Sequence, residues 1–410
     1  MTTTTEAIIR PAADERAADL ISGPMTLLFA IAVGVIVTNL FAPQTLVGLI
    51  GPSLGIGAGG SGLVATATLL GYAAGLFLLV PLADLVENRR LIVRMLVCAV
   101  LAASLATLAP TAGPLLVLLF LLGAACSAIQ ILVPIAAAMA PADRRGRVIG
   151  DVMGGLMVGI LLARPVASFI ADVYGWRAFY GVSALAMAAL TLVLALRLPQ
   201  RRSVVRSSYP ALIASLWHLL RAEPILRRRA LTASLAMAAF SLFWTAVALR
   251  LSQPPFELSQ RGIALFALAG AGGAVVTPLF GRAGDRGWTR PATIASHLVM
   301  VAALALAAWA GSAGSGTPLL SLLLMGASAV LLDVGVTGDQ TLGRRAINLL
   351  QPEARGRING LFVGLFFLGG AVGSGVAGAA WTWGGWPTVC AIGAAFGVAA
   401  LLSDLVERRG

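Results

Sequence analysis

Long apolar runs, separated by short connectors rich in charge, dominate this sequence. The connector at residues 81–93, PLADLVENRRLIV, places an aspartate, a glutamate and two arginines between two such runs. A helix needs about 20 mostly apolar residues to cross the hydrocarbon layer, and the run must be helical because lipid cannot satisfy open backbone groups. The shorter alternating segments of a β-barrel are not seen. With 59% hydrophobic and 11% charged residues, the sequence predicts an all-α polytopic membrane protein.

Turn and charge signals divide the apolar runs into twelve predicted transmembrane helices. They lie near residues 25–50, 62–83, 91–110, 113–140, 148–171, 176–197, 230–252, 258–281, 291–310, 317–342, 357–380 and 386–405. Connectors after even-numbered helices collect arginine, and cytoplasmic loops are enriched in basic residues. We therefore expect both termini to be cytoplasmic. The same rule accounts for the net charge of +12 without a nucleic-acid partner.

The connectors and tails define five predicted segments. Residues 1–24 and 406–410 would be cytoplasmic tails, and the polar start lacks the pattern of a cleavable signal peptide. Residues 25–197 and 230–405 would form two six-helix halves. The linker at 198–229 carries leucines along one helical face, which predicts an amphipathic helix on the inner membrane surface. These leucines are Leu212, Leu216, Leu219 and Leu220.

An internal repeat relates the two halves at a constant offset of 210 residues. The matching positions are Arg145/Arg355, Gly146/Gly356, Arg147/Arg357, Gly150/Gly360, Gly159/Gly369, Gly175/Gly385, Trp176/Trp386 and Gln130/Gln340. Chance similarity among apolar runs would not place charged, glycine and tryptophan residues in one register. In membrane proteins such a repeat points to a transporter whose site lies between the halves.

The charged connectors resemble a loop of the major facilitator superfamily, G-x-L-a-D-r-x-G-r-r/k, found between helices 2 and 3 and again between helices 8 and 9. GRAGDRGWTR at residues 281–290 is closely similar, and VPLADLVENRR at 80–90 is a weaker copy with Val80 and Glu87 at the loop glycines. The resemblance covers the chain from about residue 25 and extends to bacterial drug- or sugar-efflux proton antiporters. It implies twelve helices in two pseudo-symmetric six-helix bundles, in a bacterial cytoplasmic (inner) membrane.

The resemblance also implies a cytoplasmic gate, in which loop charges latch the two halves together when the transporter opens outward. Carried over to this sequence, the gate residues are Asp84, Arg89, Arg90, Asp285, Arg286 and Arg290. If the loop charges served only to stop the transfer of a helix across the membrane, they would explain the arginines. They would not explain the repeated aspartate. Two departures weaken the likeness to drug antiporters. Helix 4 has Leu119 and Leu122 near Gly123 instead of an arginine, and helix 5 reads LLARPVAS.

Three ionisable residues stand out inside the predicted helices, where a charge costs at least about 2.5–3.5 kcal/mol on insertion scales. Asp333 in helix 10 is a candidate for proton or substrate coupling, with a structural hydrogen bond as the alternative. Asp339 is expected nearer the cytoplasmic end, facing Arg344 or Arg345. Arg164 in helix 5 could hold a counter-charge, bind an anionic substrate, or snorkel to the outer interface.

Uncharged polar and aromatic residues of the predicted helices suggest a cavity lining. They are Asn39, Gln44, Tyr72, Gln130, Phe243, Trp244 and Gln340. Any one of them could instead bond a neighbouring helix. Closely spaced glycines are read as helix packing positions. His297 is expected to be buried, His218 belongs to the surface helix, and neither has a nearby ligand set for a metal.

These observations predict a secondary active transporter. It would export a small amphipathic or sugar-like solute by alternating access, coupled to proton entry, as a monomer in the bilayer and without a cofactor. No Walker loop, nucleophile elbow or metal motif supports an enzyme. A proton-coupled importer stays open, because direction depends on gradients. A transporter-shaped sensor without turnover is a further alternative.

Overall fold

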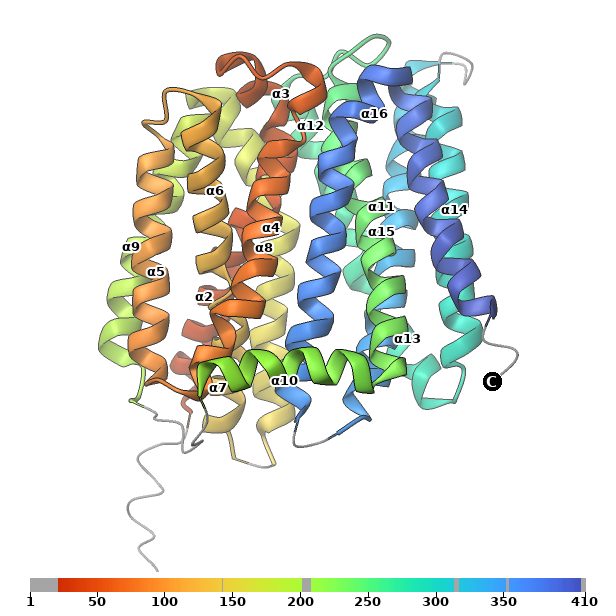
Figure 1. The fold of residues 1–410 in the computed structure, drawn as a ribbon. Helices are drawn as coiled ribbons and strands as arrows, with labels where there is room; N and C mark the ends of the chain where they lie inside the picture. Colours follow the sequence, from red (N-terminus) through yellow and green to blue (C-terminus); the bar gives the residue numbers. More distant parts are fainter. Residues whose placement is uncertain (1–20, 142, 201–207, 313–316, 352–353, 407–410) are drawn as a thin grey trace, which may run out of the picture.

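The computed structural model describes residues 21–141, 143–200, 208–312, 317–351 and 354–406. Most of the two predicted tails lies outside these residues. Within the described ranges the regular secondary structure is helical, without strands, and long helices run side by side between two ends of the molecule (Figure 1). The all-α prediction is confirmed.

The N-terminal part of the bundle runs from Gly23 to Arg197. Its helices are α2 (Gly23–Phe41), α3 (Pro43–Ser53), α4 (Leu63–Leu78), α5 (Asn88–Ala106), α6 (Ala112–Cys126), α7 (Ile129–Met139), α8 (Arg145–Tyr174) and α9 (Trp176–Arg197), with the short 3₁₀ turns η1 (Ala58–Gly60) and η2 (Val80–Asp84). Within this part α2 packs against α8, α4 against α6, and α5 against α9.

The C-terminal part begins after the linker. Its helices are α11 (Pro224–Leu251), α12 (Gln260–Ala267), η3 (Leu268–Ala271), α13 (Gly272–Asp285), α14 (Thr289–Gly311), α15 (Pro318–Asn348) and α16 (Arg355–Leu405). Here α11 packs against α16, and α14 against α15. The two parts meet where α4 contacts α16, α8 contacts α12 and α3 contacts α11.

Nine helical segments of the described residues are long and apolar enough to cross a membrane. Helix α5 is not among them, because Arg89, Arg90 and Arg94 occupy its first turns. The predicted span at 258–281 is interrupted by the 3₁₀ turn η3. Helix α16 has 51 residues, about 75 Å at 1.5 Å per residue, which is more than two membrane thicknesses. The presence of twelve transmembrane helices stays a prediction. These three differences account for the gap between the nine segments and the twelve predicted helices.

The long helix α16 turns back on itself at Gly384 and Gly385. Gly385 has φ +64° and ψ −152°, a backbone conformation that residues with a Cβ avoid. Gly175, its partner in the repeat, has φ +81° at the end of α8. Each glycine is followed by a buried tryptophan that donates a hydrogen bond: Trp176 to the Ser53 hydroxyl and Trp386 to the Ala307 carbonyl. The repeat therefore marks corresponding turns in the two parts.

The linker forms α10 (Tyr209–Ala222), which lies across the lower end of the bundle in Figure 1. Leu212, Leu216 and Leu219 are buried on its inner side. The Tyr209 hydroxyl donates to the Leu78 carbonyl of α4, and Arg357 of α16 donates to the Ser215 hydroxyl. Helix α10 thus bonds to both parts of the molecule.

Helix α8 touches α2 through Gly159. A Cβ atom at this position would lie 2.3 Å from the Gly34 carbonyl oxygen and 2.7 Å from a Val37 methyl group. At Gly154, on the same helix, a Cβ would meet nothing within 4 Å. The close approach of α2 and α8 therefore requires the absence of a side chain at Gly159 but not at Gly154.

We predict that Gly159→Ala destabilises the purified protein, because overpacking a close helix contact costs roughly 1–3 kcal/mol. The thermal melting temperature in detergent is the measurement. Gly154→Ala is the matched control and should melt like the parent protein or slightly higher. Equal melting temperatures for the two variants would contradict the close packing.

Candidate functional site

A cavity of about 700 Å³ lies between the two parts of the bundle. Helices α2, α4, α7 and α8 line one side, and α11, α13, α15 and α16 line the other. The lining reaches Arg345 and Asn348 in the last turn of α15 and Leu349 just after it, so the cavity extends toward the end of the molecule that carries α10.

The opposite end is closed by contacts between the two parts. Arg261 of α12 bonds Asp172 of α8, with 2.6 Å between guanidinium Nε and carboxylate Oδ2. The Thr66 hydroxyl of α4 donates to the Ala371 carbonyl of α16 at 3.1 Å. A Cβ at Gly62 would lie 1.9 Å from the Ser374 carbonyl oxygen, which shows how closely the backbones approach. The structure is therefore open at one end and packed at the other.

Arg164 of α8 occupies the inner end of the cavity. Its side chain is 3% exposed, and Nε and Nη2 both donate to the Gln44 amide oxygen, at 3.0 and 2.8 Å. Three aromatic rings surround the guanidinium group. Its carbon lies 5.3 Å from the ring centroid of Phe41, 5.0 Å from that of Phe240 and 4.3 Å from that of Trp244, within the range of cation–π attraction. Arg164 does not snorkel to an interface.

Asp333 faces Arg164 from the other part of the molecule. It lies midway along α15 and is 5% exposed, and its Oδ1 accepts a hydrogen bond from the Trp244 indole at 3.0 Å. Arg164 and Asp333 also attract each other electrostatically. Trp244 thus contacts both charges, through its ring face and through its N–H group.

The interrupted stretch between α12 and α13 makes room for this arrangement. A Cβ at Gly270 in η3 would lie 3.1 Å from Asp333 Oδ2 and 3.3 Å from the Trp244 ring. The missing side chain lets the backbone of η3 lie against the carboxyl group. Gly270 also lines the cavity, although the sequence analysis did not single it out.

A second polar group lies nearer the open end. Gln130 of α7 donates to the Tyr72 hydroxyl at 3.2 Å, and the Tyr72 ring packs edge-on against Phe367 at 4.6 Å between centroids. Arg344 of α15 lies within electrostatic range of Tyr72. Arg344 lines the cavity together with Gln340. This part of the wall therefore combines amide, hydroxyl, aromatic and cationic groups.

The predicted cavity residues divide between the wall and the layer behind it. Tyr72, Gln130, Gln340, Arg164 and Asp333 line the cavity. The others lie outside the lining: Gln44 holds Arg164, Trp244 holds Asp333, Phe243 packs against Trp244 and Trp386, and the Asn39 amide oxygen accepts from the Ser183 hydroxyl at 2.6 Å.

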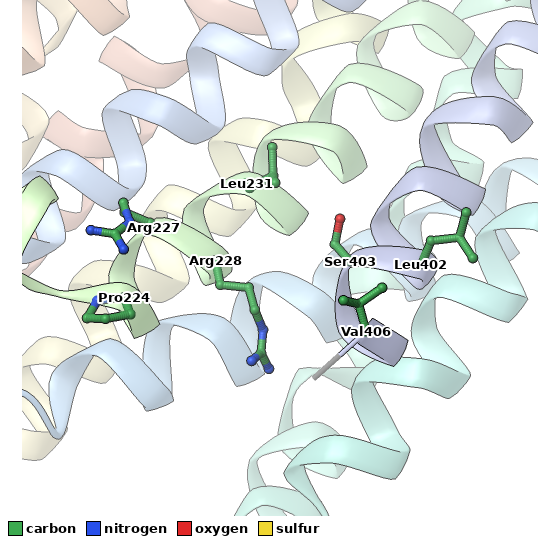
Figure 2. A pocket seen from close by; sticks show the side chains of 7 residues that line it. All are labelled: Pro224, Arg227, Arg228, Leu231, Leu402, Ser403 and Val406. Atoms are coloured by element: carbon green, nitrogen blue, oxygen red, sulfur yellow. The ribbon is translucent and has the colours of Figure 1, made fainter. Parts of the chain in front are cut away.

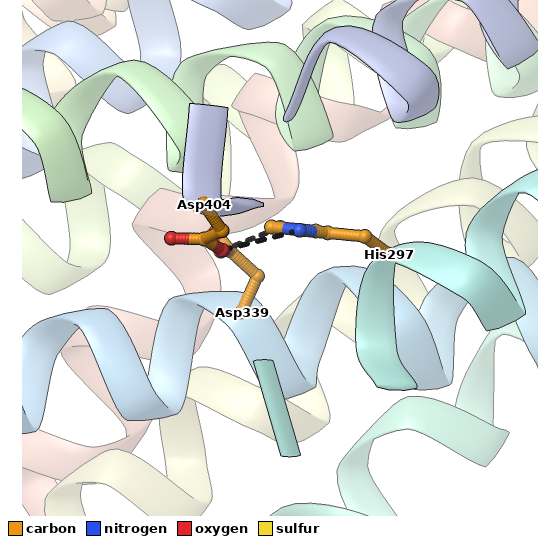
Figure 3. Close-up of side chains that lie close together, drawn as sticks. All are labelled: His297, Asp339 and Asp404. Atoms are coloured by element: carbon orange, nitrogen blue, oxygen red, sulfur yellow. Dashed lines mark hydrogen bonds and ion pairs between the residues drawn. The ribbon is translucent and has the colours of Figure 1, made fainter. Parts of the chain in front are cut away.

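Asp339 pairs with a histidine of a neighbouring helix. Its Oδ1 lies 3.0 Å from Nε2 of His297 in α14. The imidazole Nδ1 lies 3.3 Å from Oδ2 of Asp404 near the end of α16. Figure 3 shows the imidazole ring pointing at both carboxyl groups. The expected pairing of Asp339 with an arginine of α15 is therefore wrong.

The same cluster corrects the expectation that His297 has no ligand set nearby. His297, Asp339 and Asp404 offer three ligand atoms within 4.8 Å of one another, and all three side chains are buried. However, Arg229 of α11 lies 3.3 Å from Asp404 Oδ1 and Arg228 lies 3.6 Å from it. Two guanidinium groups already neutralise this carboxylate, so the cluster is best described as a buried charge network that joins α11, α14, α15 and α16.

The charged connectors pair within their own parts of the molecule in this state. Arg345 bonds Asp285, Glu87 lies 3.4 Å from Arg90, and Arg89 donates to the Leu198 carbonyl. Arg286 lies over the Trp288 ring, and Arg290 is exposed. Asp84, another of the six predicted gate residues, is within electrostatic range of the other part through Arg357 of α16.

A second hollow, of about 510 Å³, lies on the surface between the start of α11 and the end of α16 (Figure 2). Its lining is Pro224, Arg227, Arg228, Leu231, Leu402, Ser403 and Val406. It lies apart from the central cavity and shares no lining residue with it.

A profile of the Major Facilitator Superfamily matches residues 27–338. The chain belongs to this superfamily. The resemblance drawn from its charged loops is thus confirmed, and the chain is a multi-pass membrane transporter of a small solute and not an enzyme.

Relatives and solved structures agree with the family. The chain is 37% identical over 395 residues to "Uncharacterized transporter YgaY" of Escherichia coli O157:H7, covering 95% of this chain and 96% of that protein. It is 30% identical over 376 residues to "Probable transporter SCO4007" of Streptomyces coelicolor, covering 90% and 84%.

Among solved structures, a mutant form of the nucleoside transporter NupG superposes with a TM-score of 0.74 at 16% identity, covering 94% of this chain and 100% of the other. A D-xylose-proton symporter superposes with a TM-score of 0.72 at 14% identity, covering 92% and 96%. At these identities the likeness shows the major facilitator fold.

We predict that His297→Phe lowers the melting temperature of this transporter strongly. Removal of the imidazole takes a buried hydrogen-bonding partner away from Asp339 and leaves it beside Asp404, and a buried polar group left without its partner costs about 1–3 kcal/mol or more. His218→Phe, on the exposed face of α10, is the matched control and should change little. If both variants melt alike, the network does not stabilise the fold.

Proposed function

We propose that this transporter exports a small amphipathic or sugar-like solute by alternating access, driven by proton entry. The observation that carries the proposal is the central cavity itself. It lies between the two parts of the bundle, is open at one end only, and has Arg164 and Asp333 from opposite parts facing each other at its inner end. A rocking motion of the two parts would expose the same residues to the other side.

Asp333 is the proposed proton carrier. Its carboxyl group lines the cavity midway along α15, with one hydrogen bond from Trp244 and the charge of Arg164 opposite. Protonation would remove its attraction to Arg164 and leave that guanidinium with Gln44 and the aromatic rings. Because these charges belong to different parts of the molecule, a proton on Asp333 would change how strongly the parts hold together. Such a change can couple protonation to a two-state motion.

The charged connectors are proposed as the second half of the cycle. Asp84 and Asp285, with their neighbouring arginines, lie at the end that is open here, and most of them pair within their own part. When the cavity opens to the other side, these groups would pair across the parts and hold this end shut. The pair Arg261–Asp172, which now bridges the closed end, would separate. We propose a monomer in the bacterial inner membrane with both termini cytoplasmic, so the present state opens inward.

Import is the second candidate. One protein of similar structure is a D-xylose-proton symporter, and a cavity with one carboxyl group serves symport as well as antiport. The direction depends on the order of binding and on the gradients. A sensor without turnover would bind solute but move no protons. The following experiment therefore tests both import and the sensor as alternatives to export.

We predict that Asp333→Asn abolishes proton movement coupled to solute in proteoliposomes that contain a pH-sensitive dye. Solutes are added under an imposed pH gradient, and solute-dependent proton flux is recorded. The amide keeps the shape and the Trp244 contact but cannot release a proton. Asp151→Asn, at an exposed position of α8, is the matched control and should retain the flux. Retained coupling in Asp333→Asn would remove Asp333 from the mechanism.

We predict that a cysteine at Asn348 is labelled by a membrane-impermeant maleimide in inside-out vesicles and not in right-side-out vesicles. Asn348 lines the open end of the cavity. Ser252→Cys, exposed at the opposite end of α11, should show the reverse pattern. Both are made in a background without Cys98, Cys126 and Cys390. The inverse labelling of the two sites would overturn the proposed orientation.

A further inference from the structure

We infer that the transported solute carries an acidic group, and that Arg344 binds it. This inference rests on the proposal that the central cavity is the solute site. It adds a chemical class to that proposal, an organic anion with an apolar or aromatic body.

The charges of the cavity lining do not balance. Among the described residues that line it, the cations are Arg164, Arg344 and Arg345, and Asp333 is the one carboxylate. Asp333 attracts Arg164 electrostatically, and Arg345 bonds Asp285, which lies just outside the lining. Three arginines therefore face two carboxylates. The charge left over is that of Arg344.

Arg164 is poorly placed to bind a solute anion. Two of its nitrogens donate to Gln44, and aromatic rings lie over the guanidinium group. Its side chain is only 3% exposed. The group is held in place by protein contacts on several sides, and Asp333 offsets its charge. Arg164 fits a fixed counter-charge better than a ligand-binding group.

Arg344 is placed differently. It is partly exposed and lines the cavity, and its Nε is buried without a hydrogen-bond partner among the described residues. Arg344 forms no ion pair with a carboxylate of the described residues. A buried cationic donor without a partner is costly. A carboxylate in the cavity would relieve this cost, because a planar guanidinium group binds it through two parallel hydrogen bonds.

The surroundings of Arg344 suit a solute that is acidic at one end. Gln340 and Thr341 precede it on the cavity side of α15, and Tyr72 lies within its electrostatic range. Phe366 and Phe367 line the wall near Tyr72. The polar groups can bind an acidic head, and the aromatic rings can pack against an apolar body. One surplus positive charge favours a carboxylate over a phosphate ester that carries two negative charges.

The test is a thermal-shift measurement on the full-length protein in detergent at constant ionic strength. The probes are three matched sets: phenylacetate with phenylacetamide, hexanoate with hexanamide, and cyclohexanecarboxylate with its amide. Phenyl phosphate is added as a separate probe for the phosphate chemistry. We expect at least one carboxylate to raise the melting temperature of the parent protein above the value with its amide, because a ligand stabilises the folded state that it binds.

The variants locate the binding. Arg344→Gln should weaken the affinity for the carboxylate by about ten- to a hundredfold, and Arg344→Lys should recover part of it, since the charge stays but the two-pronged geometry is lost. Arg94→Gln, at an exposed position of α5, is the matched control and should bind like the parent. The inference is overturned if no carboxylate exceeds its amide and phenyl phosphate gives no stabilisation either, or if Arg344→Gln folds and binds the anion as the parent does. A phosphate preference that is lost in Arg344→Gln keeps Arg344 as the anion site and replaces the carboxylate with a phosphate ester.

Failure of this inference can be distinguished from failure of the proposed function. If a carboxylate binds through Arg344 but no solute moves protons in proteoliposomes, the transport proposal fails and the anion site stands. If neutral solutes move protons equally well in the parent and in Arg344→Gln, the anion site fails and coupled transport stands.

Discussion

A guanidinium group buried between two helical bundles is the feature on which the central site depends. Arg164 is 3% exposed, and a charge removed from water in this way must be compensated by dipoles, rings and opposite charge. Gln44 supplies the dipole from its own part of the molecule, and Phe240, Trp244 and Asp333 come from the other. The share of the compensation that comes from Phe240, Trp244 and Asp333 therefore exists only while the two parts lie together at this level. A movement that separates them must exchange these contacts for others, which is why the site and the motion are linked.

The sequence was informative wherever a constraint acts locally. Apolar length and the arginine-rich connectors predict helices that cross a membrane, because lipid leaves the backbone no alternative. The charged connectors GRAGDRGWTR and VPLADLVENRR carried the resemblance to the family, which the profile match confirms. Glycine and tryptophan at a fixed offset identified two related turns, and both tryptophans are buried and hydrogen-bonded. An ionisable residue in an apolar run drew attention to Arg164 and Asp333 because of its cost.

Features that depend on how distant helices meet were not predictable from one sequence. Asp404 lies near the charged end of the chain, and its position in the sequence suggests a residue at the end of the last transmembrane helix. In the structure it is buried beside His297 and Arg229. Asn39 looks like a cavity amide, but its partner is Ser183 on α9. Arg344 could have been found, since it lies eleven residues after Asp333 on the same helix and so within about 20° of the same face. This spacing from Asp333 indicates a cavity residue, but Arg344 also lies close to a charged loop and was therefore not recognised as one.

Helix α10 has a mechanical consequence. It donates from Tyr209 to the backbone of α4 and accepts at Ser215 from Arg357 of α16, so it spans the gap between the bundles like a strap. The bundles cannot move apart at this end without breaking one of two hydrogen bonds, each worth about 1 kcal/mol. A restraint of this size is less than twice the thermal energy, which permits frequent stretching and opposes wide separation. The linker thereby biases the two bundles toward a narrow opening without fixing its width.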